Sequence, residues 1–480
     1  MKESVLSDHN TSTNLEVPVN QSIRTVTLDE AFELTYGNGR YQLLIFLAGF
    51  IGMASSMWYL YCIPFFLSFP KVLGCKNGIC ETEEEACNST SRYYDNVNYN
   101  LITELDLLCK DIDLSIIPSS FPMGFLMGNI ILSSAADIFG RLPVLLIGQF
   151  GMTFSILYFC FFPSYNTCII CTSLCGFFSV ASFFPSYSLL YGANHSNRVK
   201  LCAAFLAVSA AVAGLMVVSL MRTKITWRLM CVIFMCFCSL FYIFPTVFNE
   251  SPPFFYSKGQ PKSAAKIFYD IAKMNKVELN QALEIKDTGR TATKGASCLD
   301  KMKLIFMKWI LINLALCGIS FFAAGFVYYG IVFNIEKFGG NLYDNVMINT
   351  VAEIIADVLA FAFGYKIGLK KTMILAFSIM TGGLVCQFLS KWTYEILDIL
   401  GLFVAKFGVS AAFIMIYSWA GELFPTAILS TAIGFLGLCD RVGALLSPIP
   451  TKDTFSLIGI ASGIAAIIIA FTITQKKDNS

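Results

Sequence analysis

Long apolar stretches recur along the chain and constrain its fold more than any other feature. Each is about 20 residues long, which is the length that an α-helix needs to cross the hydrocarbon core of a bilayer. The stretches lie near residues 42–67, 114–136, 144–162, 168–190, 201–221, 228–248, 308–333, 345–364, 372–390, 396–420, 431–449 and 454–473. Charged residues make up only 14% of the chain, whereas soluble domains carry about 25%. The sequence therefore predicts an all-α, multi-pass protein of twelve spans that lies in a lipid bilayer.

A long polar segment divides these twelve stretches into two groups of six. We expect an N-terminal six-helix bundle at 41–248 and a C-terminal six-helix bundle at 308–473, joined by a central loop at 249–307. A polar segment at 1–40 precedes the first bundle, and a short tail at 474–480 follows the second.

The distribution of charge predicts how the protein is oriented in the membrane. Lysine and arginine concentrate in the central loop and the tail, whereas the segment at 70–113, between the first two spans, is acidic. Basic residues mark the cytoplasmic side of membrane proteins. The central loop and both termini are therefore expected in the cytoplasm, and 70–113 is expected to be a large extracellular loop.

The predicted extracellular loop contains four cysteines in a polar context and one glycosylation acceptor. The acceptor is Asn88, which is followed by Ser89 and Thr90. The four outer-loop cysteines are Cys75, Cys80, Cys87 and Cys109. They are expected to form two disulfides, and they allow three pairings. Disulfides and a glycan indicate passage through an oxidising secretory route, so we expect the plasma membrane, with an endomembrane as the alternative.

Several kinds of chemistry have no support in the sequence. The two histidines, His9 and His195, lie outside the apolar stretches, which argues against a histidine-ligated metal or a histidine-based triad. The sequence has no G-x-x-x-x-G-K-S/T motif for ATP hydrolysis and no basic stripe that would bind nucleic acid. We therefore expect no enzyme activity, metal or cofactor, and transport driven by a solute gradient, the membrane potential, or a coupled ion or proton.

Short motifs at matching positions along the chain resemble those of a known family. Residues 133–141 (SSAADIFGR) resemble the G-x-L-A-D-R-x-G-R loop of the major facilitator superfamily, and 250–255 (ESPPFF) are similar to its E-S-P-R-W-L signature. Further stretches resemble the organic cation/anion transporter family within it: 104–109 (ELDLLC), 326–330 (FVYYG), 405–408 (AKFG), 422–426 (ELFPT) and 439–443 (CDRVG).

This resemblance implies the major facilitator fold, in which two bundles rock around a central site. It also implies that charged residues and one glycine at helix ends act in gating: Asp137, Gly140, Arg141, Arg198, Glu250 and Glu422. The chain departs from the family at Tyr191 and Tyr365, which stand where acidic residues are usual.

Ionisable residues inside a span are costly and are therefore candidates for a functional site. The second half has four by our count, namely Glu353, Asp357, Asp440 and Arg441. Glu353 and Asp357 are one helical turn apart, so one of the two is expected to hold a proton. Three acids against one base favour an organic cation or a zwitterion as the substrate. The alternative is that Arg441 forms a structural bridge with one of the acids.

Aromatic residues at helical spacing are expected to complete the substrate site through cation–π contacts and hydrogen bonds. They are Phe184 and Tyr187 in the fourth span, Phe326 and Tyr329 in the seventh, and Tyr417 in the tenth. The alternative is that they pack against neighbouring helices or face lipid.

The sequence thus predicts a transporter of small organic ions that works by alternating access. The alternatives are a sugar or organic anion porter of the same superfamily, or a receptor that keeps the fold without transport.

Overall fold

The computed structural model describes the backbone of fourteen ranges of the chain. They are 23–68, 73–75, 78–79, 93–94, 100–107, 110, 113–192, 196–246, 250–279, 282–286, 306–338, 340–392, 395–424 and 429–473.

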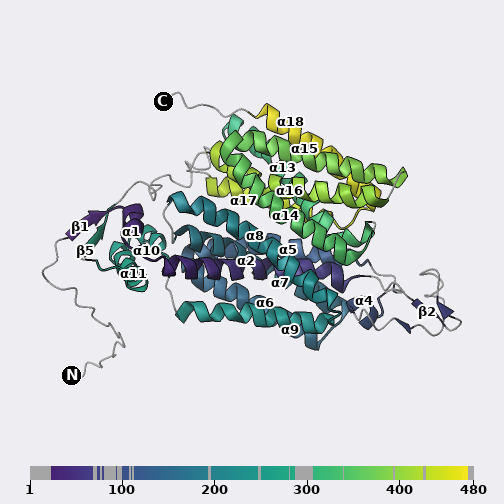
Figure 1. Ribbon diagram of the computed structural model, residues 1–480, viewed down its shortest axis with the longest axis horizontal. Coiled ribbons are helices and arrows are strands. Elements are labelled where there is room, and N and C mark those ends of the chain that lie inside the picture. Colours follow the sequence, from purple (N-terminus) through teal and green to yellow (C-terminus); the bar gives the residue numbers. More distant parts are fainter. Residues whose placement is uncertain are drawn as a thin grey trace, which may run out of the picture.

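Twelve long helices form the body of the molecule (Figure 1). The first six are α2 (Arg40–Phe66), α5 (Ile116–Phe139), α6 (Arg141–Phe161), α7 (Tyr165–Gly192), α8 (Ser196–Arg222) and α9 (Trp227–Ser239), the last continued by a 3-10 helix, η2 (Leu240–Thr246). The second six are α13 (Lys308–Phe333), α14 (Leu342–Ile367), α15 (Leu369–Leu389), α16 (Glu395–Leu423), α17 (Leu429–Leu446) and α18 (Lys452–Thr472). Each overlaps one predicted stretch, so the prediction of twelve helices in two groups of six is confirmed.

The helices follow from the requirement that a chain in lipid satisfies its own backbone hydrogen bonds. Eight of them are long and apolar enough to cross a membrane over the described residues alone. Shorter apolar helical segments lie in α5, α8 and α9.

The two groups of helices form two bundles, coloured purple to teal and green to yellow in Figure 1. Close packing of α5 on α7 depends on glycine: a side chain at Gly124 would overlap the Ser173 carbonyl, and one at Gly176 would overlap the Phe121 carbonyl. Small residues at such crossings are typical of helices packed in membranes. The two bundles meet where α8 contacts α14 and where α5 contacts α17.

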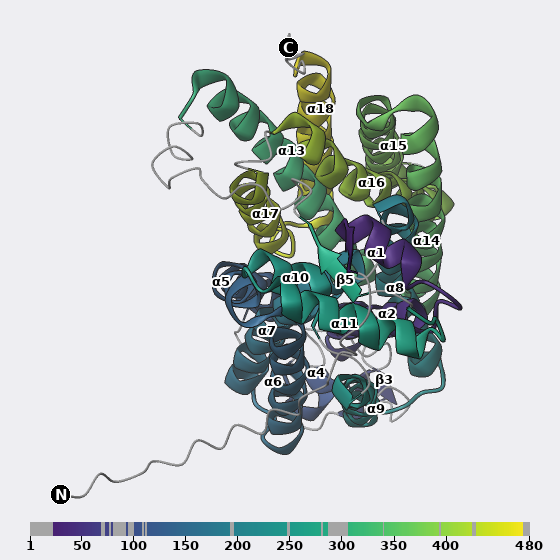
Figure 2. The same cartoon turned by 90° about the vertical axis from the view of Figure 1, so that its left-hand side faces the viewer.

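A small α/β unit covers one end of the first bundle (Figure 2). Its strands β1 (Ile23–Val26) and β5 (Ala282–Ile285) pair in parallel, and its helices are α1 (Leu28–Leu34), α10 (Pro252–Ser257) and α11 (Pro261–Met274). The Asn275 side chain joins the unit to α2, because it accepts a hydrogen bond from the Tyr41 N–H (2.8 Å) and donates one to the Thr35 carbonyl (2.8 Å). The sequence predicted the segment at 1–40 and the central loop at 249–307 as separate regions, and it did not predict that they pack together.

The opposite end carries the described parts of the large loop between the first two spans (Figure 1). They form the strands β2 (Leu73–Cys75), β3 (Gly78–Ile79) and β4 (Tyr93–Tyr94), and the short helix α4 (Leu101–Glu104). Glu104 fixes α4 to the start of α9, since it accepts a hydrogen bond from Trp227 Nε1 (2.7 Å) and pairs with Arg228.

The expected disulfides and glycan of this loop fall largely outside the described residues. Cys80, Cys87, Asn88 and Cys109 are not described, and of Cys75 only the backbone in β2 is described.

Candidate functional site

A buried ion pair lies between two helices of the second bundle. Lys406 on α16 is fully buried, and its Nζ lies 3.0 Å from Oε2 of Glu353 on α14. The same ammonium lies over the ring of Tyr328 on α13, 3.4 Å from the centroid, which is a cation–π contact. The Tyr328 hydroxyl donates to Glu353 Oε1 at 2.6 Å. Three helices of the second bundle are therefore tied together at one carboxylate.

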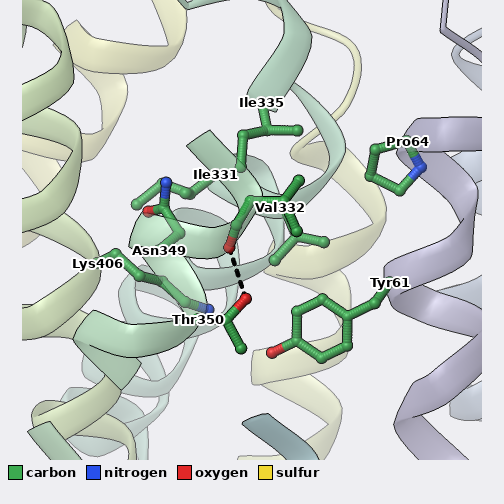
Figure 3. Close-up of a pocket in the computed structure, with 9 residues that line it drawn as sticks. Tyr61, Pro64, Ile331, Val332, Ile335, Asn349, Thr350 and Lys406 are labelled. Atoms are coloured by element: carbon green, nitrogen blue, oxygen red, sulfur yellow. Dashed lines mark hydrogen bonds between the residues drawn. The ribbon is translucent and has the colours of Figure 1, made fainter. Parts of the chain in front are cut away.

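Glu353 also binds a residue of the first bundle. The hydroxyl of Tyr61 on α2 donates to Glu353 Oε2 at 2.7 Å and lies 3.4 Å from the Tyr328 hydroxyl. Tyr61 and Lys406 border a small cavity between the bundles, together with Pro64, Val332, Asn349 and Thr350 (Figure 3). At about 10 Å³, the cavity has room for about one water molecule.

A second buried ion pair lies on α17, where Asp440 and Arg441 are adjacent in the chain. Arg441 Nη2 lies 3.4 Å from Asp440 Oδ2, and the guanidinium donates a hydrogen bond to the Tyr329 hydroxyl. The guanidinium also lies over the ring of Phe125 on α5, 3.8 Å from the centroid. Arg441 thus connects the second bundle to the first, as Glu353 does.

Asp440 lies in a notch that a glycine provides. A side chain at Gly325 on α13 would overlap both the Asp440 carbonyl and its carboxylate. Neither carboxylate oxygen has a hydrogen-bond partner of normal geometry among the described residues, although the Tyr417 side chain lies beside it.

The sequence-based count of charges in the spans was wrong, because it omitted Lys406. The count also omitted Asp398 near the start of α16, which is buried and pairs with the partly exposed Lys452. Away from that pair, the described buried charges of the second bundle are three acids and two bases, and Glu353 pairs with Lys406, not with Arg441. Lys406 was present in the 405–408 motif, and it is the single basic residue of the 396–420 stretch. Tyr61 was also missed, because one tyrosine among many aromatic residues gives no sequence signal for a contact between bundles.

The predicted aromatic residues have different surroundings. Tyr329 binds Arg441, and Phe184 contacts Phe125 with ring centroids 6.4 Å apart. Phe326 stacks on Phe455 of α18 at 5.4 Å, so it packs within the second bundle. Of Tyr187 only the backbone in α7 is described.

Three of the residues predicted to act in gating meet at the start of α6. Glu250 Oε2 accepts a hydrogen bond from the Leu142 N–H (2.8 Å), which places a carboxylate at the positive end of the α6 dipole. Gly140 has φ +107°, and a side chain there would come within 2.7 Å of the Glu250 carboxylate. Arg141 lies 3.4 Å from the Ser251 hydroxyl and over the Phe254 ring. The side chains of Asp137, Arg198 and Glu422 are outside the described residues.

Comparison with known sequences identifies relatives along most of the chain. A family model described as Major Facilitator Superfamily matches residues 93–448. "Solute carrier family 22 member 15-like" of Xenopus tropicalis is 27% identical over 425 residues, which cover 84% of this chain and 85% of the relative. "Organic cation/carnitine transporter 2" of Homo sapiens is 26% identical over 388 residues, which cover 77% of this chain and 67% of the relative.

Comparison with solved structures shows the same fold. The crystal structure of a D-xylose-proton symporter superposes with a TM-score of 0.62 at 14% identity, covering 91% of this chain and 98% of the symporter. The inward open xylose transporter XylE from E. coli gives a TM-score of 0.61 at 14% identity, covering 92% and 97%. The two-bundle architecture and the match over residues 93–448 show that this chain belongs to the Major Facilitator Superfamily.

Proposed function

We propose that this protein carries a small organic cation or zwitterion across the membrane by alternating access, without hydrolysing ATP. Proteins of this superfamily move solutes through a site between two bundles. The names of several relatives, which include organic cation and carnitine transporters, support an organic ion as the substrate. Sugar transport has weaker support, because the likeness to the xylose transporters at 14% identity concerns the fold alone.

The observation that carries this proposal is the buried carboxylate of Asp440, whose oxygens have no hydrogen-bond partner of normal geometry among the described residues. A buried carboxylate without hydrogen bonds is costly, because burial removes its hydration. Arg441 compensates its charge only in part, since the guanidinium also binds Tyr329 and Phe125. The positive group of a substrate would give Asp440 a second positive partner beside Arg441.

The charge balance of the site supports the same substrate class. Asp398 is compensated by Lys452 near the start of α16. Of the other described buried charges in the second bundle, Glu353, Asp357 and Asp440 are three acids, and Lys406 and Arg441 are two bases. The remaining negative charge favours a cation or a zwitterion over an anion, although by less than the sequence-based count implied. Tyr329, Phe184 and Tyr417 would contribute aromatic surface to the bound cation. Tyr187 remains a candidate, and Phe326 is best explained by packing.

We assign the Gly140–Arg141–Glu250 contacts to the inner gate. They connect the turn between α5 and α6 to the start of α10. Arg141→Ala should change the transport rate more than substrate binding at the central site. Loss of binding with a normal turnover rate of the remaining sites would contradict this role. Asp137, Arg198 and Glu422 stay in the same proposed role on the resemblance alone.

The proposed location is the plasma membrane, with the α/β unit and both termini in the cytoplasm. The support is the basic central loop, the acidic 70–113 segment, and its cysteines and glycosylation acceptor. The expected solute partner is small, and a coupled ion or proton is part of the proposal.

Replacement of Asp440 tests the proposed substrate site. Asp440→Asn keeps the shape of the side chain and removes its charge. Removing one member of a buried charged pair costs roughly 2–5 kcal/mol of binding, so affinity for a cation should fall at least about tenfold. Asp453→Asn is the matched control, because Asp453 lies in an exposed ion pair with Lys391.

The result must be normalised to the amount of protein at the cell surface. Unchanged cation affinity in Asp440→Asn, together with anion uptake that requires Arg441, would reverse the charge assignment.

A further inference from the structure

Two cysteine thiols meet where α6 packs on α9 in the first bundle. Cys160 lies in the last turn of α6, and Cys231 lies one turn after the start of α9. The Cys160 thiol is within hydrogen-bonding reach of the Cys231 thiol. Both are free cysteines, and Cys231 is buried whereas Cys160 is partly exposed. The proposed transport function uses neither residue.

Contacts beside the thiols place the two helix ends against each other. The ring centroids of Phe159 and Trp227 lie 5.0 Å apart, and Arg228 Nε donates a hydrogen bond to the Cys160 carbonyl at 3.4 Å. Cys231 follows Trp227 and Arg228 by one helical turn, so the three residues share a face of α9. That face contacts the end of α6, and the thiols are therefore neighbours because the helices pack there.

The thiol pair lies at the end of the bundle that carries the loop between the first two spans. Glu104 of that loop pairs with Arg228, whose side chain is 42% exposed, so water reaches this end of α9. The proposed orientation places this end outside the cell, where disulfides form and persist. A small oxidant in the medium therefore reaches the partly exposed Cys160 before the buried Cys231.

Inert packing is the alternative role for these two cysteines. A free cysteine in an apolar environment behaves as a small hydrophobic side chain, and Cys238 of the same helix α9 has the Thr153 hydroxyl as its neighbour. Cys160 and Cys231 differ from it, because each has a second thiol as its neighbour and one of the two is accessible. This combination is what a disulfide requires.

We propose that Cys160 and Cys231 are a redox modification site, at which hydrogen peroxide converts the two thiols to a disulfide. The Cys160 sulfur attacks one peroxide oxygen and the O–O bond breaks, which gives the Cys160 sulfenic acid and one water. The Cys231 sulfur then attacks the sulfenic sulfur and the S–O bond breaks, and the hydroxyl leaves as water with the Cys231 proton. Two thiols are oxidised, and one peroxide is reduced to two waters.

The disulfide would cross-link two helices of the same bundle. The two bundles move relative to each other in this fold, whereas α6 and α9 stay together, so the cross-link should leave transport unchanged. The closed loop includes α7 and α8, and closing a long loop lowers the entropy of the unfolded chain. We therefore expect oxidation to raise the unfolding temperature of the protein.

Purified full-length protein in detergent micelles tests the inference, and in micelles the result does not depend on orientation in a membrane. The protein is reduced, freed of reductant, treated with hydrogen peroxide, denatured, alkylated with N-ethylmaleimide and digested without reductant. Mass spectrometry should find the Cys160 peptide linked to the Cys231 peptide, lighter than their sum by two hydrogen atoms. Alkylation of both cysteines should be lost in parallel, and a reductant should restore it.

Three variants assign the reaction to this pair. Cys231→Ser should form no cross-link, and its Cys160 should stop at the sulfenic acid, which dimedone labels. Cys160→Ser should leave Cys231 open to alkylation after peroxide. Cys236→Ser is the matched control, because Cys236 is an exposed free cysteine on α9, and it should cross-link like the wild type. Peroxide should raise the unfolding temperature of the wild type and of Cys236→Ser by more than that of the other two variants.

Other products would overturn the inference. A link from Cys160 to Cys171 of α7, whose thiol also lies near it, would show that the proposed pairing is wrong. Full alkylation of Cys160 in the peroxide-treated wild type would show that no modification site exists. Dimedone labelling of wild-type Cys160 while Cys231 stays alkylated would show oxidation without a disulfide.

Discussion

The ion pair between Lys406 and Glu353 allows a quantitative test of the site. Lys406→Met keeps an unbranched side chain of similar length and removes the charge. The substitution leaves Glu353 beside Asp357 with no base nearby. Breaking a buried pair by removing one partner costs roughly 3–5 kcal/mol. We expect a loss near the lower limit, about 3 kcal/mol, because Tyr61 and Tyr328 still donate to the Glu353 carboxylate.

A double substitution separates the pair from other effects of Lys406. In Lys406→Met/Glu353→Gln, the Gln amide oxygen can accept a hydrogen bond from one tyrosine and its NH2 group can donate to the hydroxyl of the other, and neither member of the former ion pair leaves an unpaired charge. The double variant should therefore be more stable than the sum of the single losses predicts. Contacting residues show coupling energies of roughly 0.5–3 kcal/mol in such cycles, and we expect the upper half of this range.

The free energy of unfolding in mixed detergent micelles is the quantity to measure. Lys391→Met is the matched control, because it breaks the exposed ion pair with Asp453, which is worth about 1 kcal/mol or less. A loss in Lys406→Met no larger than in this control would refute the reasoning. So would a double variant whose loss equals the sum of the two single losses.

Three further predictions concern the surroundings of the site. Gly325→Ala places a methyl group against the Asp440 carboxylate and should lower cation uptake at least about tenfold at equal surface expression. Gly434→Ala on α17, where a side chain meets nothing within 4 Å, should leave uptake unchanged. Glu250→Gln removes the charge at the start of α6 and should destabilise the protein by about 0.3–1 kcal/mol, whereas no change in its unfolding would contradict the capping role. The four outer-loop cysteines should resist a thiol-reactive mass tag until reduction, and labelling of all four without reductant would exclude the disulfides. A glycosidase should change the electrophoretic mobility of the protein only when Asn88 is intact.

The fold was predictable because each span carries its own signal. A stretch of about 20 apolar residues has one stable solution in lipid, namely a helix, so the number and order of helices follow from the sequence alone. The α/β unit was not predictable in the same way. Strand β1 precedes the first six-helix bundle in the sequence and β5 follows it, yet the two strands pair. Contacts between residues so far apart in the sequence leave no local sequence pattern.

The candidate site was predicted only in part, for a related reason. The free-energy cost of a charge inside a span made Glu353, Asp357, Asp440 and Arg441 candidates. The sequence could not show which acid pairs with which base. The omission of Lys406 changed the balance of charge and gave Arg441 too large a role. The position of Tyr61 depends on how the two bundles meet, which no single span specifies.

Counterflow into liposomes that contain the purified wild-type protein tests the central claim most directly. The measurement compares one organic cation, one zwitterion and one organic anion at equal concentration, each exchanged against its own unlabelled form. We predict accumulation of the labelled cation and zwitterion above protein-free liposomes, and none of the anion. Binding of a ligand without accumulation of any solute would identify a receptor, and accumulation of the anion alone would contradict the proposed substrate class.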